Sequence, residues 1–438
     1  MAAKPYDVIL FGATGFTGRQ AVSALVHRCA NQPLRWAVAG RDAAKLKAMV
    51  AELVPAAAVQ PGIVVADVLD LTSLQAMASQ TAVLLDLAGP YALNGEGVVQ
   101  ACIAHGTHRL DLSGETFWVQ QIIARHHRAA QSAQVKIIPC CGYEALPFDL
   151  ATLWAAHQVR ERFGEPCREV KLIVGFGFGG RRITSIKDAV SGGTVATLKS
   201  LLEMDGTDCV RNPACLLPPD ARDADLTAKR NAVHFMPHYD EDVQAVTAPT
   251  IPAPFVNPPI VLRTQALLND TTLFSPEFRY AEAMNMKSLV KSVSFLPESS
   301  TLPLQWAAAA SLAAPLANLS AALAGPLKFE RQGLRKLIDW LAPKPGEGPS
   351  DEVLANTSYS FDLFATSASG KKLRGRVEAQ GHPGYRSTPE MVVTAAVGLA
   401  LGRLGNTPHF GIVTPATGLG LEAVEALREA GVVFGLQA

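Results

Sequence analysis

Short apolar runs alternate with amphipathic segments through the first third of the chain. The first run, YDVILF at residues 6–11, leads directly into a glycine-rich turn, and a segment whose apolar positions have helical spacing follows. Runs that are apolar on both faces are typical of strands buried inside a parallel sheet. Five more such runs follow, at residues 34–40, 63–66, 83–88, 109–112 and 135–139. This alternation predicts an α/β fold with a doubly wound, Rossmann-type parallel sheet over residues 1–150.

Beyond residue 150 the pattern changes to longer β-rich runs and separate helices. Residues 170–178 form a β-rich run, and residues 358–366 and 372–379 predict a hairpin. We therefore expect a second, α+β domain over residues 151–380, followed by amphipathic helices within residues 381–438.

Residues 205–260 are rich in Pro, Asp and Asn. Clusters of these residues interrupt regular structure, so the segment predicts an irregular insertion. A lid over the site is the alternative.

A long uncharged segment, residues 304–327, carries no Asp, Glu, Lys or Arg across 24 positions. Its leucines recur at spacings of four or three and form one helical stripe, made of Leu312, Leu316, Leu319, Leu323 and Leu327. A single stripe favours a helix packed on one partner surface, either within the fold or in a homodimer. Peripheral contact with lipid and a membrane-spanning helix are the alternatives.

Charge and composition narrow the classes of function. The 39 basic and 39 acidic residues give a formal net charge of zero, and no long run of either sign occurs. No nucleic-acid partner is expected, since proteins that bind nucleic acid carry a basic excess. The seven cysteines form no CxxC pair, which indicates free thiols in a reducing compartment. The N-terminus lacks the pattern of a signal peptide, so we expect a cytoplasmic protein.

The turn after the first predicted strand has the sequence GATGFTG. Between a strand and a helix, Gly12 permits the tight turn, Gly15 lets the backbone approach a pyrophosphate, and Gly18 allows the helix to pack closely on the strand. Unpaired amides at the start of the helix would then face the phosphates. The predicted cofactor-binding residues of this turn are Gly12, Thr14, Gly15, Phe16, Thr17 and Gly18. A turn without a ligand is the alternative, because a glycine triplet alone is a weak signal.

The second predicted strand ends in Gly40-Arg41. NAD-binding domains usually carry Asp or Glu at this point, where the carboxylate binds the ribose 2′-hydroxyl. Arg41 is suited instead to a 2′-phosphate, and Lys45 lies one turn later. These residues favour NADP over NAD. An arginine that only caps an exposed loop is the alternative.

Two later strand ends complete the predicted nucleotide site. Asp67 and Val68 follow the third strand, where an acid and an apolar residue often flank adenine, and Asp67 as the N-cap of a short helix is the alternative. The fourth strand is followed by Ala88, Gly89, Pro90 and Tyr91. This turn lies at the carboxyl edge of the sheet, next to the switch point, where a nicotinamide would bind.

Hydride transfer also needs a proton donor and a group that stabilises developing negative charge. The polar candidates at the carboxyl edge are Tyr91, His108, Asp111, Glu115, Tyr143 and Glu144. Tyr143 would donate a proton and Glu144 would orient it, while a core aromatic with a satisfied hydroxyl is the alternative for Tyr143. Asp111 and Glu115 are expected to bind ribose or to cap the following helix, and His108 to be structural. The sequence shows no metal-ligand cluster, nucleophile elbow or catalytic triad, so no metal is expected.

Nine stretches in chain order carry a resemblance to a known family. They are GATGFTG (12–18), AGR (39–41), AGPY (88–91), VVQAC (98–102), GTHRLDLSGE (106–115), CGYEALPFDL (141–150), SGGTVAT (191–197), HPGY (382–385) and TPATGLG (414–420). At these residues the chain resembles the saccharopine dehydrogenase-like oxidoreductases, in particular the branch that contains the trans-acting enoyl reductases. That family usually has Asp-Ser where this chain has Glu144-Ala145.

The resemblance implies an NADP-dependent oxidoreductase. Residues 151–380 would form a substrate and dimerisation domain, and the helices of residues 381–438 would pack back on the Rossmann domain. The leading hypothesis is NADPH-dependent reduction of an activated C=C bond, in an enoyl thioester or an unsaturated carbonyl compound. A saccharopine-type imine or amino-acid dehydrogenase is an alternative, and it would need basic residues such as Arg181-Arg182 to hold substrate carboxylates. The third hypothesis is a nucleotide-bound scaffold without catalysis that docks on lipid or protein through residues 304–327.

Overall fold

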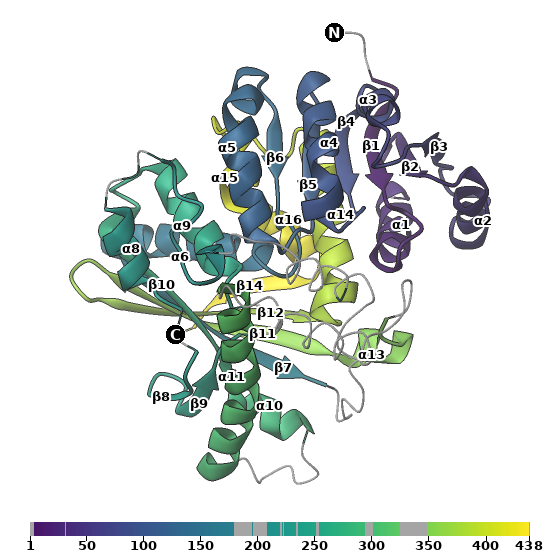
Figure 1. Ribbon diagram of the computed structural model, residues 1–438. Helices are drawn as coiled ribbons and strands as arrows, with labels where there is room; N and C mark the ends of the chain where they lie inside the picture. Colours follow the sequence, from purple (N-terminus) through teal and green to yellow (C-terminus); the bar gives the residue numbers. More distant parts are fainter. Residues whose placement is uncertain are drawn as a thin grey trace.

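Two seven-stranded sheets organise the computed structural model shown in Figure 1. The structure describes residues 4–30, 32–178, 195, 208–219, 221, 223–233, 235–250, 254–293, 301–324 and 348–437. Most of the stretch 191–197 and the Arg181-Arg182 pair lie outside these ranges.

The first sheet is parallel throughout. Its strands are β1 (Tyr6–Phe11), β2 (Trp36–Gly40), β3 (Gly62–Val65), β4 (Thr81–Asp86), β5 (His108–Asp111), β6 (Lys136–Ile138) and β13 (Gly411–Ile412). They lie in the order β13-β6-β5-β4-β1-β2-β3. The central strand β1 is buried from Val8 to Phe11, because helices cover both faces of the sheet. The strand order reverses between β1 and β4, as it does at the switch point of a Rossmann fold, which confirms the predicted fold class.

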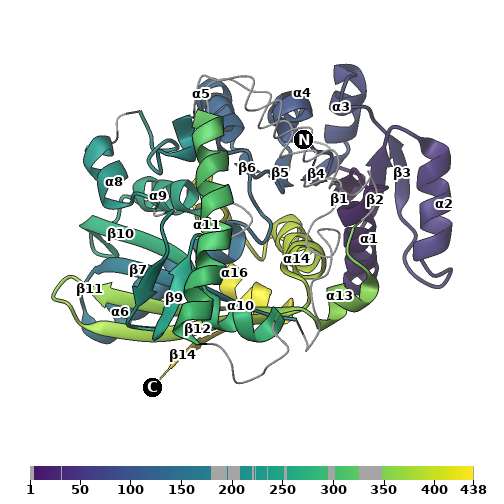
Figure 2. The ribbon, with the colours of Figure 1, turned by 60° about the horizontal axis from the view of Figure 1, so that its bottom comes forward.

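The helices of this sheet lie on its two faces. They are α1 (Phe16–Cys29), α2 (Ala43–Leu53), α3 (Leu71–Ala78), α4 (Tyr91–Ala104) and α5 (Thr116–Ser132). α1 and α2 pack on one face, and α3, α4 and α5 pack on the other. A helix from the end of the chain, α14 (Thr388–Ala400), lies beside α1 and contacts β1 and β4 (Figure 2).

The second sheet is mixed, as expected for an α+β domain. Its strands are β7 (Cys167–Gly177), β8 (His238–Asp240), β9 (Ala245–Ala248), β10 (Phe274–Asn285), β11 (Ser358–Ser367), β12 (Lys372–Gln380) and β14 (Val432–Leu436). They lie in the order β14-β12-β11-β7-β10-β9-β8, with only β7 and β10 parallel. β11 and β12 form the predicted hairpin. Alternate residues of β11, among them Tyr359 and Phe361, are buried on the face that packs against α6 (Leu146–Phe163).

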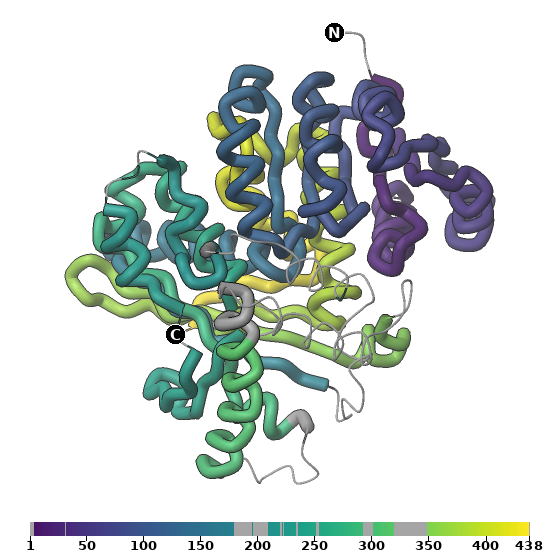
Figure 3. The backbone as a smooth tube through the Cα atoms, viewed as in Figure 1, coloured from purple at the N-terminus to yellow at the C-terminus, as the bar shows by residue number. Residues whose placement is uncertain are grey.

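The remaining elements connect the sheets. They are η2 (Asp208–Val210), α8 (Ala224–Arg230), α9 (Asn257–Leu268), α10 (Met286–Val293), α11 (Leu302–Ala324), α13 (Asp351–Asn356), η3 (Pro383–Ser387), α15 (Pro415–Leu419) and α16 (Ala423–Glu429). Figure 3 shows that the last part of the chain returns to both layers. Its strand β13 adds to the edge of the parallel sheet, and its strand β14 adds to the edge of the mixed sheet.

The segment 205–260 is more regular than its composition predicts. β8 and β9 extend the mixed sheet, and every residue of β9 is buried. Here Pro, Asp and Asn separate short elements. The run AVTA forms a strand because it pairs with β10, which lies far away in the sequence, and composition does not report such pairing. The prediction of an irregular insertion is therefore wrong for this part of the segment.

Among the described side chains of α11, small residues and Gln305 are the most deeply buried, and Leu312 of the predicted leucine stripe packs beside them. Between residues 302 and 318, Gln305, Ala309 and Ala313 are buried, while Leu312 and Leu316 are half-buried. The alanines let the helix approach β9 closely, and Gln305 Oε1 accepts from Val246 N at 2.9 Å. The side chains of Leu319, Leu323 and Leu327 lie outside the described residues.

Two further observations concern the whole described chain. All seven cysteines are buried, and none forms a disulfide. Within the described ranges, every helix is too short or too polar to cross a membrane.

A fully buried ion cluster, called here the Arg109 hub, joins the carboxyl ends of β4 and β5. Arg109 donates to Asp86 Oδ2 from Nε at 3.0 Å and from Nη2 at 2.6 Å, and its Nη1 donates to Asp111 Oδ2. None of the three side chains has exposed surface. Burial opposes the charge on Arg109, but the carboxylates of Asp111 and Asp86 raise its pKa overall. The forked donors of one guanidinium thus hold two strands together.

The Arg109 hub also holds the turns that follow β4, β5 and β6 at this edge of the sheet. Asp86 Oδ1 accepts from Ala88 N at 3.0 Å in the turn after β4. Asp111 Oδ1 accepts from Ser113 N at 2.8 Å after β5 and from Cys140 N at 3.3 Å after β6. The carboxylates that pair with Arg109 therefore fix the starts of the loops that carry the candidate site.

A second buried carboxylate, Asp149 in the first turn of α6, ties the second domain to the C-terminal segment. Thr264 Oγ1 donates to Asp149 Oδ1 at 2.6 Å, and Ala416 N in α15 donates to Oδ2 at 2.8 Å. Burial raises the pKa of Asp149 from 3.8 to about 7, although these hydrogen bonds favour the charged form.

Replacing Arg109 by methionine leaves two carboxylates buried without a counter-charge. We expect Arg109→Met to lower the free energy of unfolding by about 3–5 kcal/mol, as when one partner of a buried ion pair is removed. Urea unfolding followed by circular dichroism measures this. Arg125→Met is the matched control, because Arg125 is half-exposed and pairs with Glu96 at the surface. In this control the free energy of unfolding should fall by less than about 1 kcal/mol. Equal decreases in the two variants would contradict the role of the hub.

Asp149 makes stability depend on pH. Its folded pKa lies above its unfolded value, so between pH 3.8 and about 7 the folded state binds the proton more tightly, and stability falls as the pH rises through this window. Asp149→Asn keeps an acceptor for Ala416 N and a donor for Thr264 without a titrating group. We expect the stability of the variant relative to wild type to grow by about 2–3 kcal/mol from pH 5 to pH 8, measured by urea unfolding.

The control for this experiment is Asp270→Asn. Hydrogen bonds from Thr272 lower the pKa of the half-buried Asp270 carboxyl, so this variant should gain no stability at pH 8. A stability difference for Asp149→Asn that stays constant between pH 5 and pH 8 would show that Asp149 does not titrate in this range.

Candidate active site

The turn between β1 and α1 accepts only glycine at two positions. Gly12 has a φ of +82°, and a Cβ on it would lie 2.7 Å from the carbonyl carbon of Leu87. A Cβ on Gly18 would lie 2.7 Å from the carbonyl oxygen of Ala13 and would also meet that of Gly12. The missing side chains bring the turn against the loop after β4 and let α1 pack on β1.

The N-terminus of α1 presents open backbone amides. Gly15 is its N-cap, and no described side chain caps the helix. Thr14 and Gly15 are exposed, and Phe16 and Thr17 are half-buried. Amides without an intrahelical partner, together with the helix dipole, suit this terminus to a phosphate group.

The end of β2 presents positive charge. Arg41 is exposed, and Lys45 has 76% of its side chain exposed. Asp42 lies between them, but its Oδ1 accepts from the amides of Ala44 and Lys45 at 3.0 Å and caps α2. Because capping engages this carboxylate, the strand end suits the 2′-phosphate of NADP better than a ribose hydroxyl.

Parallel pairing brings the ends of β1, β2 and β3 to one edge. Gly12 N donates to Ala39 O at 3.0 Å, and Ala66 N donates to Gly40 O at 3.1 Å. The glycine turn and the predicted residues after β2 and β3 therefore lie side by side at the carboxyl edge of the sheet.

Asp67 follows β3 but does not cap a helix. Its Oδ1 accepts from Leu69 N at 3.0 Å, and Asp70 is the residue that caps α3. The helix-cap alternative for Asp67 is wrong, since a short turn separates β3 from α3. Both Asp67 and Val68 are half-buried at this edge.

The turn after β4 lies against the glycine turn. Leu87 N donates to Phe11 O at 2.9 Å, which continues the pairing of β4 with β1. Ala88 and Pro90 are half-buried, and Gly89 is exposed. The structure thus brings these residues beside Gly12, at the switch point of the sheet.

Tyr91 is buried, and the backbone uses its hydroxyl. The hydroxyl donates to Asp86 O at 3.1 Å and accepts from Leu112 N at 3.2 Å. The ring stacks on Trp118 with centroids 5.9 Å apart and lies 5.8 Å from the Arg109 guanidinium. Tyr91 therefore bridges the ends of β4 and β5.

The other polar candidates of this edge have partners within the fold. Asp111 belongs to the Arg109 hub. Glu115 precedes α5, but its side chain accepts from Tyr91 N at 3.1 Å and so caps the preceding helix, α4, and not the following one. Burial and the charge of Asp111 raise the pKa of Glu115 to about 7. His108 Nδ1 accepts from Lys136 N at 3.0 Å, and burial and Lys136 lower its pKa to about 4, which fits the structural role predicted for it.

The loop after β6 places Tyr143 where the two sheets face each other. Its ring lies among four aromatic rings, with centroid distances of 4.9 Å to Tyr359, 5.6 Å to Phe148, 6.1 Å to Phe361 and 6.4 Å to Phe176. These rings form the aromatic enclosure of the site.

The Tyr143 hydroxyl is buried and has no hydrogen-bond partner among the described residues. The partner that a satisfied core tyrosine would need is therefore missing from the part of the chain that the structure describes. An unpaired buried hydroxyl costs about 1–3 kcal/mol, so the group is suited to a partner that arrives with a ligand. Burial, then Tyr359 and the carboxylates of Glu282 and Glu144, raise the pKa of Tyr143 well above its ordinary value.

The same loop contains a strained backbone. Ala145 has a φ of +76°, a conformation that costs a residue with a Cβ about 1–3 kcal/mol and persists only where neighbours hold it. Ala145 N donates to Asn257 Oδ1 at 2.7 Å. Glu144 is half-buried beside the turn after β5, where its Oε2 would lie 3.5 Å from a Cβ on Gly114.

Glu282 and Asn257 of the second domain complete the site, and neither was predicted. Glu282 on β10 accepts from Asn257 Nδ2 at 2.9 Å, from Thr250 Oγ1 at 2.7 Å and from Tyr280 Oη at 2.7 Å. Burial raises the pKa of Glu282. The one signal in the sequence is a carboxylate inside the β-rich run RYAEAMN, which does not indicate what it faces.

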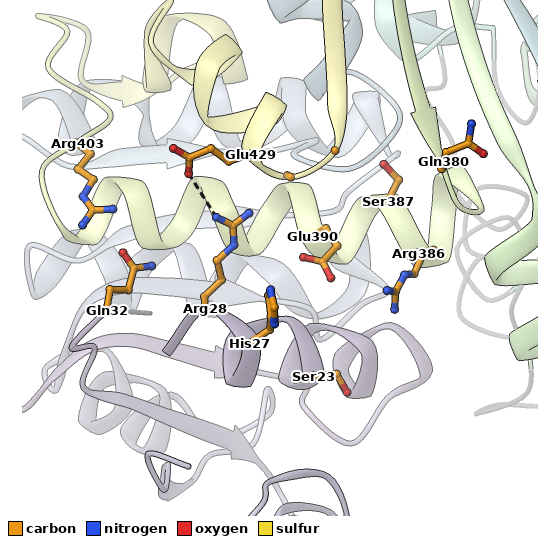
Figure 4. Close-up of a pocket in the computed structure, with 12 residues that line it drawn as sticks. Ser23, His27, Arg28, Gln32, Gln380, Arg386, Ser387, Glu390, Arg403 and Glu429 are labelled. Carbon is orange, nitrogen blue, oxygen red and sulfur yellow. Dashed lines mark ion pairs between the residues drawn. The ribbon is translucent and has the colours of Figure 1, made fainter. Parts of the chain in front are cut away.

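A polar groove of about 820 Å³ lies elsewhere, between α1 and the C-terminal segment (Figure 4). Its lining includes Ser23, His27, Arg28, Gln32, Arg386, Glu390, Arg403 and Glu429. Arg28 Nη1 lies 3.5 Å from Glu429 Oε2, and its Nη2 donates to Thr394 Oγ1 at 2.7 Å. No predicted site residue lines this groove, so it marks the contact of α1 with α14 and not the predicted nucleotide site.

Comparisons with known proteins extend over both domains of the chain. A family model described as the saccharopine dehydrogenase NADP binding domain matches residues 8–138. The trans-acting enoyl reductase of Mycobacterium leprae is 30% identical over 442 residues, which cover 99% of this chain and 98% of the relative. The trans-acting enoyl reductase of Mycobacterium tuberculosis is 30% identical over 443 residues, with the same coverage. Among solved structures, apo saccharopine dehydrogenase (L-Glu forming) from Saccharomyces cerevisiae matches with a TM-score of 0.48 and 14% identity, over 98% of this chain and 99% of that chain.

The matched NADP-binding domain extends from β1 to β6, which confirms the predicted cofactor. The relatives are similar over both domains, which confirms the resemblance and favours an enzyme over a scaffold without catalysis. The chain is an NADP-dependent oxidoreductase that belongs to the saccharopine dehydrogenase-like family, in the branch of the trans-acting enoyl reductases.

Proposed function

We propose that this oxidoreductase reduces the activated C=C bond of an enoyl thioester or a related unsaturated carbonyl compound, with NADPH as the reductant. The observation that carries the proposal is the buried Tyr143 hydroxyl, which has no partner among the described residues and lies in the aromatic enclosure. The names of the relatives support the same class of reaction.

The residues of the carboxyl edge fit the dinucleotide. We assign the pyrophosphate to the glycine turn, Gly12 to Gly18, where missing Cβ atoms and open amides leave room for it. Arg41 and Lys45 would hold the 2′-phosphate. We assign the adenine to Asp67 and Val68 and the nicotinamide to Ala88, Gly89 and Pro90. Bound NADPH supplies the hydride.

Tyr143 supplies the proton in this proposal. Reduction of an enoyl group develops negative charge on the carbonyl oxygen and requires a proton at the neighbouring carbon. The Tyr143 hydroxyl stays protonated because burial raises its pKa, so it acts as a donor and not as a base. Glu144 borders the same loop and is assigned to orient the donor. Tyr91 is assigned a positioning role, since the backbone engages its hydroxyl.

The surroundings of Tyr143 favour an uncharged acyl group over an amino acid. The enclosure is aromatic, and the carboxyl groups of Glu282 and Glu144 help to raise the pKa of Tyr143. Such carboxylates would repel the carboxylates of a saccharopine-type substrate. The basic pair that the imine hypothesis needs, Arg181-Arg182, lies outside the described residues.

α11 offers a surface for a partner. Leu302, Leu304 and Trp306 are exposed at its start, with exposed fractions of 48%, 41% and 43%. These side chains support the homodimer and the peripheral lipid contact predicted for residues 304–327. Both contacts stay predictions, as does the cytoplasmic location.

The cofactor assignment is tested by Arg41→Ala. Without the guanidinium, the Kd for NADPH should rise about tenfold or more, while the Kd for NADH stays unchanged because NADH lacks the 2′-phosphate. Fluorescence titration measures both constants. Arg35→Ala is the matched control, since Arg35 is exposed at the opposite end of β2 and pairs with Asp7. If the Kd values for NADPH and NADH rose equally, Arg41 would not bind the 2′-phosphate.

The catalytic assignment is tested by Tyr143→Phe. We expect kcat to fall by about 100-fold or more, measured as NADPH oxidation with a series of enoyl thioesters, because a proton donor is lost. The melting temperature should stay equal or rise, because the variant removes an unpaired buried hydroxyl. Tyr359→Phe is the control, because the Tyr359 hydroxyl bonds to Ser387 Oγ at 2.8 Å. The control should lose stability and keep most of its activity. Full activity of Tyr143→Phe would overturn the proposal.

A further inference from the structure

A carboxylate of the mixed sheet is linked to the Tyr143 loop across the boundary between the two domains. Glu282 lies on β10, and Asn257 at the start of α9 joins it to Ala145. Asn257 Nδ2 donates to Glu282 Oε2 at 2.9 Å, and Asn257 Oδ1 accepts from Ala145 N at 2.7 Å. The two ends of one amide group thus connect a strand of the second domain to the loop after β6.

Glu282 and the N–H of Ala145 together determine which way the Asn257 amide points. A carboxylate only accepts hydrogen bonds, so the amide nitrogen must face Glu282 and the amide oxygen must face the N–H of Ala145. Thr250 Oγ1 and Tyr280 Oη each donate to the same carboxylate at 2.7 Å and hold it in place. Asn257, Thr250 and Tyr280 are all buried, so little water competes for these bonds.

The bond to Ala145 holds a backbone conformation that residues with a Cβ rarely adopt. Ala145 has a φ of +76°, and Tyr143 lies two residues earlier in the same turn. Tyr143 N donates to Thr388 Oγ1 at 2.8 Å, which anchors the turn from the other side. A shift of the backbone at Ala145 would therefore move the Tyr143 hydroxyl within the aromatic enclosure.

We propose that Glu282 is a positioning residue for Tyr143. It orients Asn257, which holds the turn at Ala145 and thereby fixes the Tyr143 hydroxyl. The inference rests on the proposed role of Tyr143 as the proton donor. It makes the second domain part of the catalytic arrangement, because the donor is placed only when β10 and α9 lie against the loop after β6.

The proposal predicts different effects for two replacements of Glu282. Glu282→Leu removes the acceptor that Asn257 needs. Glu282→Gln keeps one acceptor oxygen for Asn257 and Tyr280, and its Nε2 can donate to Thr250 Oγ1. Glu277→Leu is the matched control, because Glu277 lies on the same strand and is exposed.

We expect Glu282→Leu to lower kcat about tenfold or more with enoyl thioesters, because a small misplacement of a catalytic group costs this much. KM and the Kd for NADPH should stay within about threefold, since the glycine turn and the substrate enclosure are retained. Glu282→Gln should recover most of kcat, and Glu277→Leu should match wild type. Full activity of Glu282→Leu would overturn the proposal. So would a Gln variant as poor as the Leu variant, which would assign the effect to the charge of Glu282.

Hydrogen exchange provides a second measurement that does not depend on activity. In Glu282→Leu, peptides that cover residues 143–150 should exchange faster, while peptides of the parallel sheet should exchange as in wild type. Unchanged exchange at residues 143–150 would overturn the link. Should Glu282→Leu fail to fold, Asn257→Ala tests the same link from its other end.

The outcomes also separate this inference from the proposed function. Full activity of Tyr143→Phe would contradict the proposed function, irrespective of the results for Glu282. If Tyr143→Phe is inactive and Glu282→Leu is fully active, the role of Glu282 is contradicted and the proposed function is retained. In the double variant, replacement of Glu282 should add little to the loss caused by Tyr143→Phe, because both act through one hydroxyl. If the fold-losses of kcat in the two single variants multiply in the double variant, Glu282 acts independently of the Tyr143 hydroxyl.

Discussion

The pairing of Arg109 with two buried aspartates is the interaction on which the arrangement of the site depends. A guanidinium and two carboxylates without access to water are stable only when each donor and acceptor has a partner. Asp86 and Asp111 meet this need by accepting from the backbone of the turns after β4, β5 and β6. The charge that stabilises the edge of the sheet therefore also fixes the loops that leave it. Tyr91 adds to this arrangement, because its hydroxyl bridges β4 and β5.

The site itself is shared between two domains. The parallel sheet supplies the edge that fits the dinucleotide. The mixed sheet supplies three of the four rings around Tyr143 and the carboxylate of Glu282. Asn257 is the polar connection between them, and it holds the strained turn at Ala145. An apolar enclosure with one unpaired hydroxyl suits a neutral acyl group, because a lone donor in a low dielectric favours a partner that develops negative charge.

Much of the nucleotide domain was predictable because its signals are local. The run at residues 6–11 coincides with β1, and the glycines that follow it have the close contacts that the motif implies. The second domain was less predictable. The burial of β9 depends on pairing with β10, and Ala309 and Ala313 are buried where α11 contacts β9. Periodicity reports which face of an element is apolar, but not which element covers it.

By itself the sequence determined the parallel sheet, the glycine turn and the preference for NADP, because each follows from residues within one strand–turn–helix unit. Which polar groups have partners follows from the tertiary structure. The Tyr91 hydroxyl is hydrogen-bonded to the backbone, whereas the Tyr143 hydroxyl has no partner among the described residues. Ala145 N donates to Asn257, 112 residues away in the sequence. The physical reason is that hydrogen bonds of buried side chains depend on which segments meet in space. Segments so far apart in the chain meet only when both sheets have formed.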